Sequence, residues 1–169
     1  MNLFKETNFH RQAIILLSAQ APKQTSALDE YSENINQLMS AFNLYDMGQK
    51  IIVLGDQCLI DTNTIKDASW LYAYNSAYER PIMTSLQRGI SLLDQDIRSA
   101  LLWPIHAPLI NIEHIQGILK EQKLNLNKVI QSHNGTFPMC IPRKEFKAIL
   151  QLNSELKIDD QLSTNTYFK

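Results

Sequence analysis

The stretch KIIVLG at residues 50–55 is β-branched at its centre and ends in glycine, which is typical of a buried strand. A second apolar run, AIILL, precedes it at residues 13–17. Between the two runs, apolar side chains recur every three or four positions from Leu28 to Phe42, as on one face of a helix. A strand, a helix and a strand in this order are the unit of a parallel sheet. The sequence therefore predicts an α/β fold.

The same alternation continues toward the C-terminus. Residues 70–74 and 99–105 have the composition of two further strands, and the apolar spacing over residues 83–93 predicts a helix between them. A short helix is expected around residues 62–67, and a longer one after Asn111, a suitable N-cap. We predict a three-layer, Rossmann-like domain with a mostly parallel sheet and helices on both faces.

A β-hairpin is expected late in the chain. Residues 128–133 and 136–141 flank Asn134-Gly135, a dipeptide that suits a two-residue turn. Pro138 has no backbone N–H to donate to a ladder, so the second arm is expected at an edge or a bulge.

The last helix is predicted over residues 143–152. Its core-facing residues are expected to be Phe146, Ile149 and Leu150. The segment 154–169 is polar and is expected to be a partly mobile tail. Because no internal boundary is visible, residues 1–169 are expected to form a single domain.

Composition excludes several classes of protein. The 169 residues carry 16 Lys and Arg against 17 Asp and Glu, a net charge of −1, which argues against a nucleic-acid face. The apolar runs are far shorter than the roughly 20 residues that span a membrane. The N-terminal residues lack the apolar core of a secretory signal, so a cytoplasmic location is predicted. Cys58 and Cys140 lie too far apart to suggest a metal knuckle.

Glycine is scarce in this chain. It occurs 5 times, whereas average usage would give roughly 12. Glycine-rich loops that cradle phosphates depend on bare backbone, so such a loop is nearly excluded.

Three strings carry a family resemblance. NSAYERPIMTSLQRGI at residues 75–90 is similar to a pattern of asparagine, spacer, Gly-Met, Ser-Leu and glycine, with Pro81-Ile82 where Gly is usual. LLWPIHAPLI at 101–110 is similar to a strand that ends in Asp-x-Pro, and NGTFPM at 134–139 to a Gly-x-x-Gly-His-Pro hairpin. Together they resemble the MobA-like molybdenum-cofactor nucleotidyltransferases and related nucleotide-sugar pyrophosphorylases. The resemblance extends over about residues 13–162 and implies a nucleotide-diphospho-sugar transferase-like fold.

The resemblance also implies a function. The family joins a nucleoside monophosphate from an NTP to a phosphorylated acceptor such as molybdopterin, using magnesium. The nucleotide-binding residues that it implies are Ser18, Gln20, Lys23, Asn75 and Ser85, with Thr84 and Arg88 on the same wall.

Two departures predict that catalysis is impaired. Residues 18–26 correspond to the family's NTP loop but contain no glycine or arginine, and Pro22 removes a further amide donor beside Lys23. His106 stands where the family has its magnesium-binding aspartate, and imidazole is a poor ligand for a hard cation. We therefore expect a binding or regulatory module with His106 left at the catalytic position. The alternative is an active nucleotidyltransferase with magnesium.

Several interpretations stay open. His106 could bind phosphate when protonated, could hold a softer metal with His133, or could be an ordinary loop histidine. Lys23 could bind an anion at the start of the first helix, or be solvated while Thr25 or Ser26 caps that helix. No metal ligands are assigned. The expected partners are a nucleotide or phosphorylated small molecule, with a homodimer or a protein partner left open.

Overall fold

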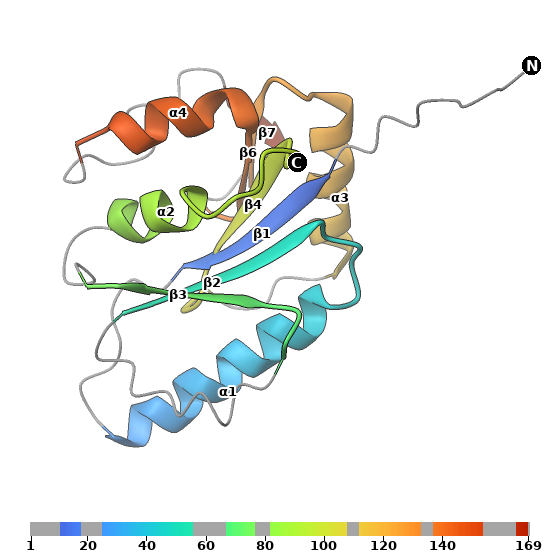
Figure 1. The fold of residues 1–169 in the computed structure, drawn as a ribbon. Coiled ribbons are helices and arrows are strands. Elements are labelled where there is room, and N and C mark those ends of the chain that lie inside the picture. Colours follow the sequence, from blue (N-terminus) through green and yellow to red (C-terminus); the bar gives the residue numbers. More distant parts are fainter. Residues whose placement is uncertain are drawn as a thin grey trace, which may run out of the picture.

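The computed structural model describes residues 11–17, 25–55, 67–76, 82–107, 112–132, 137–153 and 165–168. Its elements, drawn in Figure 1, are β1 (Gln12–Leu17), α1 (Thr25–Phe42), β2 (Gln49–Gly55), β3 (Leu71–Asn75), α2 (Met83–Ile90), β4 (Ser99–Pro104), α3 (Ile112–Leu124), β5 (Val129–Ser132), β6 (Met139–Pro142), α4 (Arg143–Gln151) and β7 (Asn165–Phe168).

The strands form one seven-stranded sheet in the order β3-β2-β1-β4-β6-β5-β7. β1 lies between β2 and β4 and is parallel to both, so that Ile15 pairs with Ile51 on one side and with Leu102 on the other. Only β6 runs against its neighbours β4 and β5. The predicted mostly parallel α/β sheet is confirmed.

Helices cover both faces of the sheet, with α1 and α3 on one face and α2 and α4 on the other (Figure 1). Successive side chains of a strand point to opposite faces. In β1, Ile14 and Leu16 therefore join the core under α1 and α3, while Ile15 and Leu17 join the core under α2 and α4. Burial on both faces explains why this strand is continuously apolar.

Helix α2 packs unusually close to the sheet at Gly89. A Cβ placed on this glycine would lie 2.6 Å from Cγ2 of Ile15 and 3.3 Å from Cγ2 of Val53. Both neighbours are fully buried strand residues. Glycine is therefore required here by close approach of the helix to β1 and β2.

A hydrogen-bond network joins the C-terminal end of α1 to the starts of β2 and β3. The Trp70 indole donates to Oδ1 of Asn43 (3.0 Å), as does the Lys50 ammonium (2.8 Å), and the Asn43 amide donates to the Asp67 carboxylate. The Ser69 hydroxyl (2.6 Å) and backbone N–H (2.9 Å) also donate to Asp67. These donors, Ser69 first, lower the pKa of Asp67 below its ordinary value.

The late hairpin differs from its prediction in the position of its second strand. β5 and β6 are antiparallel, with Ile130 opposite Cys140, as a hairpin requires, and Asn134-Gly135 of the expected turn lies outside the described residues. β6 lies inside the sheet, so its expected edge position is wrong. Pro138 precedes the strand, after a cis peptide with Phe137, and its missing N–H therefore leaves the ladder intact.

Smaller differences concern element ends. The third strand begins at Leu71 rather than at residue 70, and α2 ends before Leu93. Leu150 is 44% exposed, whereas Phe146 and Ile149 are buried as expected, so the apolar face of α4 is narrower than predicted.

Part of the predicted C-terminal tail belongs to the sheet. β7 pairs in parallel with β5, with Ile130 opposite Thr166, so residues 165–168 form a strand rather than loose chain. The remaining residues of the predicted tail, the expected cap Asn111 and residues 62–66 of the predicted short helix lie outside the described residues.

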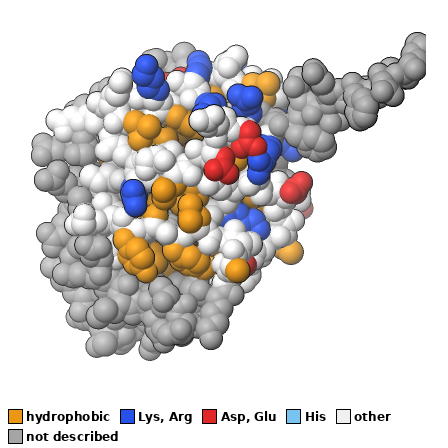
Figure 2. Space-filling view, viewed as in Figure 1, with side chains coloured by type: hydrophobic (Ala, Val, Ile, Leu, Met, Phe, Trp, Pro, Cys, Tyr) orange, Lys and Arg blue, Asp and Glu red, His pale blue; other side chains and the backbone are white. Residues whose placement is uncertain are grey.

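Charged side chains are spread over the surface. On the face drawn in Figure 2, Lys and Arg are interspersed with acidic and apolar side chains and form no continuous basic area there. Among the described helices, none has both the length and the apolar character needed to cross a membrane.

Candidate functional site

The candidate site lies at the edge of the sheet where the parallel strands β1 to β4 end. Open α/β sheets bind ligands at this carboxyl edge. Asn75 is the last residue of β3, and His106 follows the end of β4 by two residues. The structure therefore places both residues at this edge. Ser18, Gln20 and Lys23, predicted to follow β1, lie outside the described residues.

His106 sits in a tight turn. The Ala107 N–H donates to the Pro104 carbonyl (2.9 Å), which closes a reverse turn over these four residues. The Ile105 N–H donates to the carbonyl of Leu17 (2.9 Å) and so ties the turn to the end of β1. Ile105 is fully buried, whereas His106 is exposed. The turn thus holds the backbone firmly while the imidazole side chain remains accessible.

Asn34 of α1 holds this turn from a second side. Its amide donates to the carbonyl of Ile105, across 71 positions of sequence. Sequence reasoning missed this residue. The available signal was asparagine, a weak helix former, inside a helical segment and next to the apolar Ile35. In the structure Asn34 is half-buried, and a polar side chain at such a position is expected to have a hydrogen-bond partner.

Asn75 joins β3 to α2. It is 7% exposed, and its Nδ2 donates to Oγ1 of Thr84 (2.8 Å) and to Oγ of Ser85 (3.0 Å), which lie in the first turn of α2. The structure thus brings Asn75 and Ser85 together. The N-cap residue of α2 is Ile82, which makes no side-chain cap.

The site is extended rather than compact. Asn75 and His106 end strands that are three places apart in the order β3-β2-β1-β4. With a spacing of about 4.8 Å between strands, this puts them roughly 14 Å apart. They do not converge on a single atom, so they could contact only different parts of one elongated ligand.

The described residues of this edge do not fit a magnesium ion. Magnesium prefers six oxygen ligands, and the residue at the expected carboxylate position is His106. Within the described segments, no three His, Cys, Asp or Glu residues are grouped as metal ligands. The suggested partner His133 lies outside those segments. What the described part of this edge offers a ligand is hydrogen-bonding groups and the His106 imidazole.

Replacing Asn75 with alanine is expected to lower the free energy of unfolding by about 1 kcal/mol. The change removes the two hydrogen bonds that hold the start of α2 to the end of β3. Urea denaturation measures the effect. Ser76→Ala, at the exposed neighbouring position, is the matched control and should leave stability unchanged. Equal stability of the two variants would show that the hydrogen bonds of Asn75 contribute nothing to the stability of the fold.

Comparison with known proteins gives fold matches only. No family model and no curated protein matches the sequence. A homologue of Mycobacterium tuberculosis Rv0371c from Mycobacterium sp. strain JC1 has a similar structure, with TM-score 0.67 and 12% identity, covering 94% of this chain and 85% of that one. A 4-diphosphocytidyl-2C-methyl-D-erythritol synthase from Anaerococcus prevotii gives TM-score 0.66 at 13% identity, covering 96% and 90%.

A third match is to a nucleotidyl transferase from Methanothermobacter, with TM-score 0.62 and 12% identity, covering 86% of this chain and 77% of that one. Identities this low establish shared architecture and do not establish shared activity. The chain therefore has the fold of the nucleotidyltransferases and nucleotide-diphospho-sugar transferases.

Proposed function

We propose that this chain is a divergent, MobA-like nucleotidyltransferase-fold protein that binds a nucleotide or a phosphorylated small molecule and transfers little or nothing. The observation that carries the proposal is the placement of His106, exposed in the fixed turn after β4. By the family resemblance, this is the position of the magnesium aspartate. The scaffold would thus act as a binding or regulatory module.

The chemistry of an imidazole supports binding without turnover. A histidine can donate a hydrogen bond to a phosphate oxygen, and it carries one positive charge when protonated. Nucleotidyl transfer, however, depends on neutralising the charge that develops around the reacting phosphate, for which the family uses a divalent ion. Interactions that hold substrate and transition state equally well do not raise the turnover rate.

An active transferase is the second candidate. It is favoured by the solved structures of similar fold that are described as a synthase and a nucleotidyl transferase. Such an enzyme would use magnesium to move a nucleoside monophosphate from an NTP to a phosphorylated acceptor such as molybdopterin.

Nucleotide titration separates the two candidates. We expect the protein to bind GTP or CTP equally well with and without magnesium, and to release no pyrophosphate, as followed by calorimetry and a coupled pyrophosphate assay. His106→Asp supplies the missing carboxylate and should make binding magnesium-dependent, with a gain of about tenfold, or 1.4 kcal/mol.

Asn127→Asp is the matched control. It adds a carboxylate at an exposed position between α3 and β5, at the opposite edge of the sheet, and should bind nucleotide as the parent does. Magnesium-dependent pyrophosphate release by the parent protein would establish the active transferase instead. Failure of both the parent and His106→Asp to bind any nucleotide would contradict the proposed site.

A further inference from the structure

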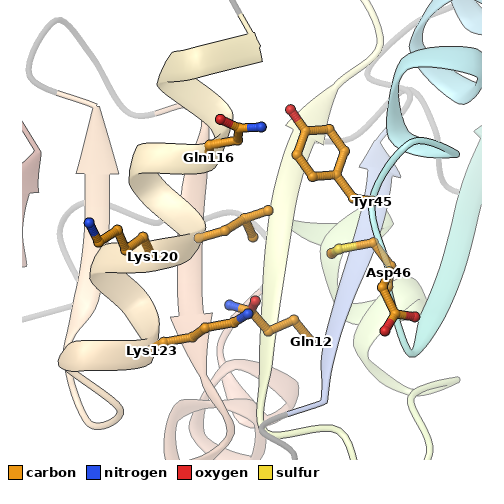
Figure 3. A pocket seen from close by; sticks show the side chains of 8 residues that line it. Gln12, Tyr45, Asp46, Gln116, Lys120 and Lys123 are labelled. Carbon is orange, nitrogen blue, oxygen red and sulfur yellow. The ribbon is translucent and has the colours of Figure 1, made fainter.

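A second concave site lies at the opposite, amino edge of the sheet. A pocket of about 280 Å³ opens between α3 and the connection from α1 to β2 (Figure 3). Residues that line it include Gln12, Tyr45, Met47, Leu119, Lys120 and Lys123. The strand β1 rises about 3.3 Å per residue, so Gln12 and the carboxyl edge at Leu17 are roughly 17 Å apart. The pocket is therefore separate from the candidate nucleotide site.

Gln12 places an unsatisfied donor in this pocket. It is the first residue of β1 and is 5% exposed, and its carbonyl accepts a hydrogen bond from the Gly48 N–H (2.8 Å). Its side-chain Nε2 is buried and finds no acceptor among the described residues. Leaving a buried amide unpaired destabilises the folded protein. A ligand oxygen bound in the pocket would offset this cost.

The charged side chains of the pocket favour an anion. Lys120 and Lys123 of α3 both line the pocket, and Asp46 is the acidic residue among the described part of the lining. Figure 3 shows Lys123 extended toward Gln12. Neither lysine forms an ion pair within the described residues. Figure 3 shows the Lys120 ammonium turned away from Gln12, so Lys123 is the cation that a ligand beside the Gln12 amide would meet.

The remaining walls are apolar or aromatic. Met47 and Leu119 are 9% and 8% exposed and form the apolar part of the lining. Tyr45 packs its ring against Phe42, and burial raises the pKa of its phenol, so that the hydroxyl keeps its proton at neutral pH. Figure 3 shows Gln116 on α3 facing the Tyr45 hydroxyl end. These walls suit a short apolar or aromatic body.

We propose that this pocket binds a small organic anion, a phosphate or carboxylate group carried on a short apolar or aromatic body. The anionic oxygens accept hydrogen bonds from the Gln12 amide and the Lys123 ammonium, which are stronger than neutral ones. The body lies against Leu119 and Met47. This binding site does not depend on nucleotide binding at the carboxyl edge.

Two probe molecules test the site. Phenyl phosphate and benzoate carry the two candidate head groups on one ring, and each is titrated by calorimetry. Binding of at least one with a Kd below about 1 mM is expected, a binding free energy of about −4 kcal/mol. Binding of phenyl phosphate alone assigns a phosphate ligand, and binding of benzoate alone assigns a carboxylate ligand. Benzyl alcohol, which lacks the charge, should not bind.

Two variants link that binding to the pocket. Gln12→Leu and Lys123→Met should each weaken the bound probe about tenfold, while Lys147→Met, the same change at an exposed position on α4, should not. Gln12→Leu should also raise the stability of the ligand-free protein, because it removes the unpaired amide. This second readout distinguishes loss of the site from loss of the fold.

Three results would overturn the proposal. The first is failure of both probes to bind, and the second is unchanged probe affinity in Gln12→Leu and Lys123→Met. The third is binding of inorganic phosphate as tightly as of phenyl phosphate, because this would show attraction to surface lysines alone. Nucleotide affinity should be the same in these variants as in the parent. The outcome is thus independent of the proposed function.

Discussion

Replacing Trp103 with alanine is expected to lower the free energy of unfolding by about 3–5 kcal/mol. Trp103 is fully buried in β4, and its ring meets that of Phe42 edge-on, with centroids 5.3 Å apart. Truncation removes this contact and leaves a cavity between the sheet and α1. Because whole domains are stable by only about 5–15 kcal/mol, the loss should be evident as a much lower urea midpoint.

Trp103→Phe is the control for that variant. It keeps an aromatic ring against Phe42 and removes an indole N–H that has no acceptor among the described residues. The phenylalanine variant should therefore lose clearly less stability than the alanine variant. Equal losses would show that the cavity does not dominate the effect.

Gly89→Ala is expected to destabilise the protein by about 3 kcal/mol, at the upper end of what overpacking costs. The added methyl would lie 2.6 Å from Cγ2 of Ile15, which is fixed in the interior strand β1. Alanine is the better helix former by about 1 kcal/mol, so propensity alone predicts the opposite sign. Thermal or urea unfolding decides between the two effects.

A double-mutant cycle tests the cause. In an Ile15→Ala background the clashing methyl is absent, so Gly89→Ala should be neutral or stabilising there. Gly117→Ala, at a half-buried position in α3, reports the helix propensity of alanine by itself. If the cost of Gly89→Ala were the same with and without Ile15, contact with this side chain would not be its origin.

The central strands were predictable because they are buried on both faces. AIILL and KIIVLG are continuous apolar runs, and such runs are read correctly without knowledge of their neighbours. The helical spacing from Leu28 to Phe42 likewise matches α1. The burial of both strand faces also determines the three-layer architecture.

Position in the sheet was harder to predict. Pro138 suggested an edge strand, but it lies one residue before β6, where no ladder hydrogen bond is needed. The strand Asn165–Phe168 has a polar start and no apolar run, so its place beside β5 is not visible in its composition. Both features depend on contacts between segments distant in sequence.

The candidate sites, like the fold, were predictable only in part. Strand ends indicated where Asn75 and His106 would lie, because parallel strands finish at one edge. The hydrogen bond from the Asn34 amide to the Ile105 carbonyl could not be predicted from either residue alone. The amino-edge pocket was missed altogether, although a glutamine at the head of an apolar strand and two lysines three apart on one helix were available as signals.

The position of β1 in the sheet has a consequence for synthesis on the ribosome. Its first neighbour, β2, is translated soon after it, but its second neighbour pairs Gln12 with Ser99, far along the message. Until β4 emerges, the nascent chain displays an apolar strand with one row of N–H and C=O groups unpaired, the kind of edge on which chains associate. Prematurely terminated chains that end before β4 would permanently retain this unpaired, aggregation-prone edge of β1.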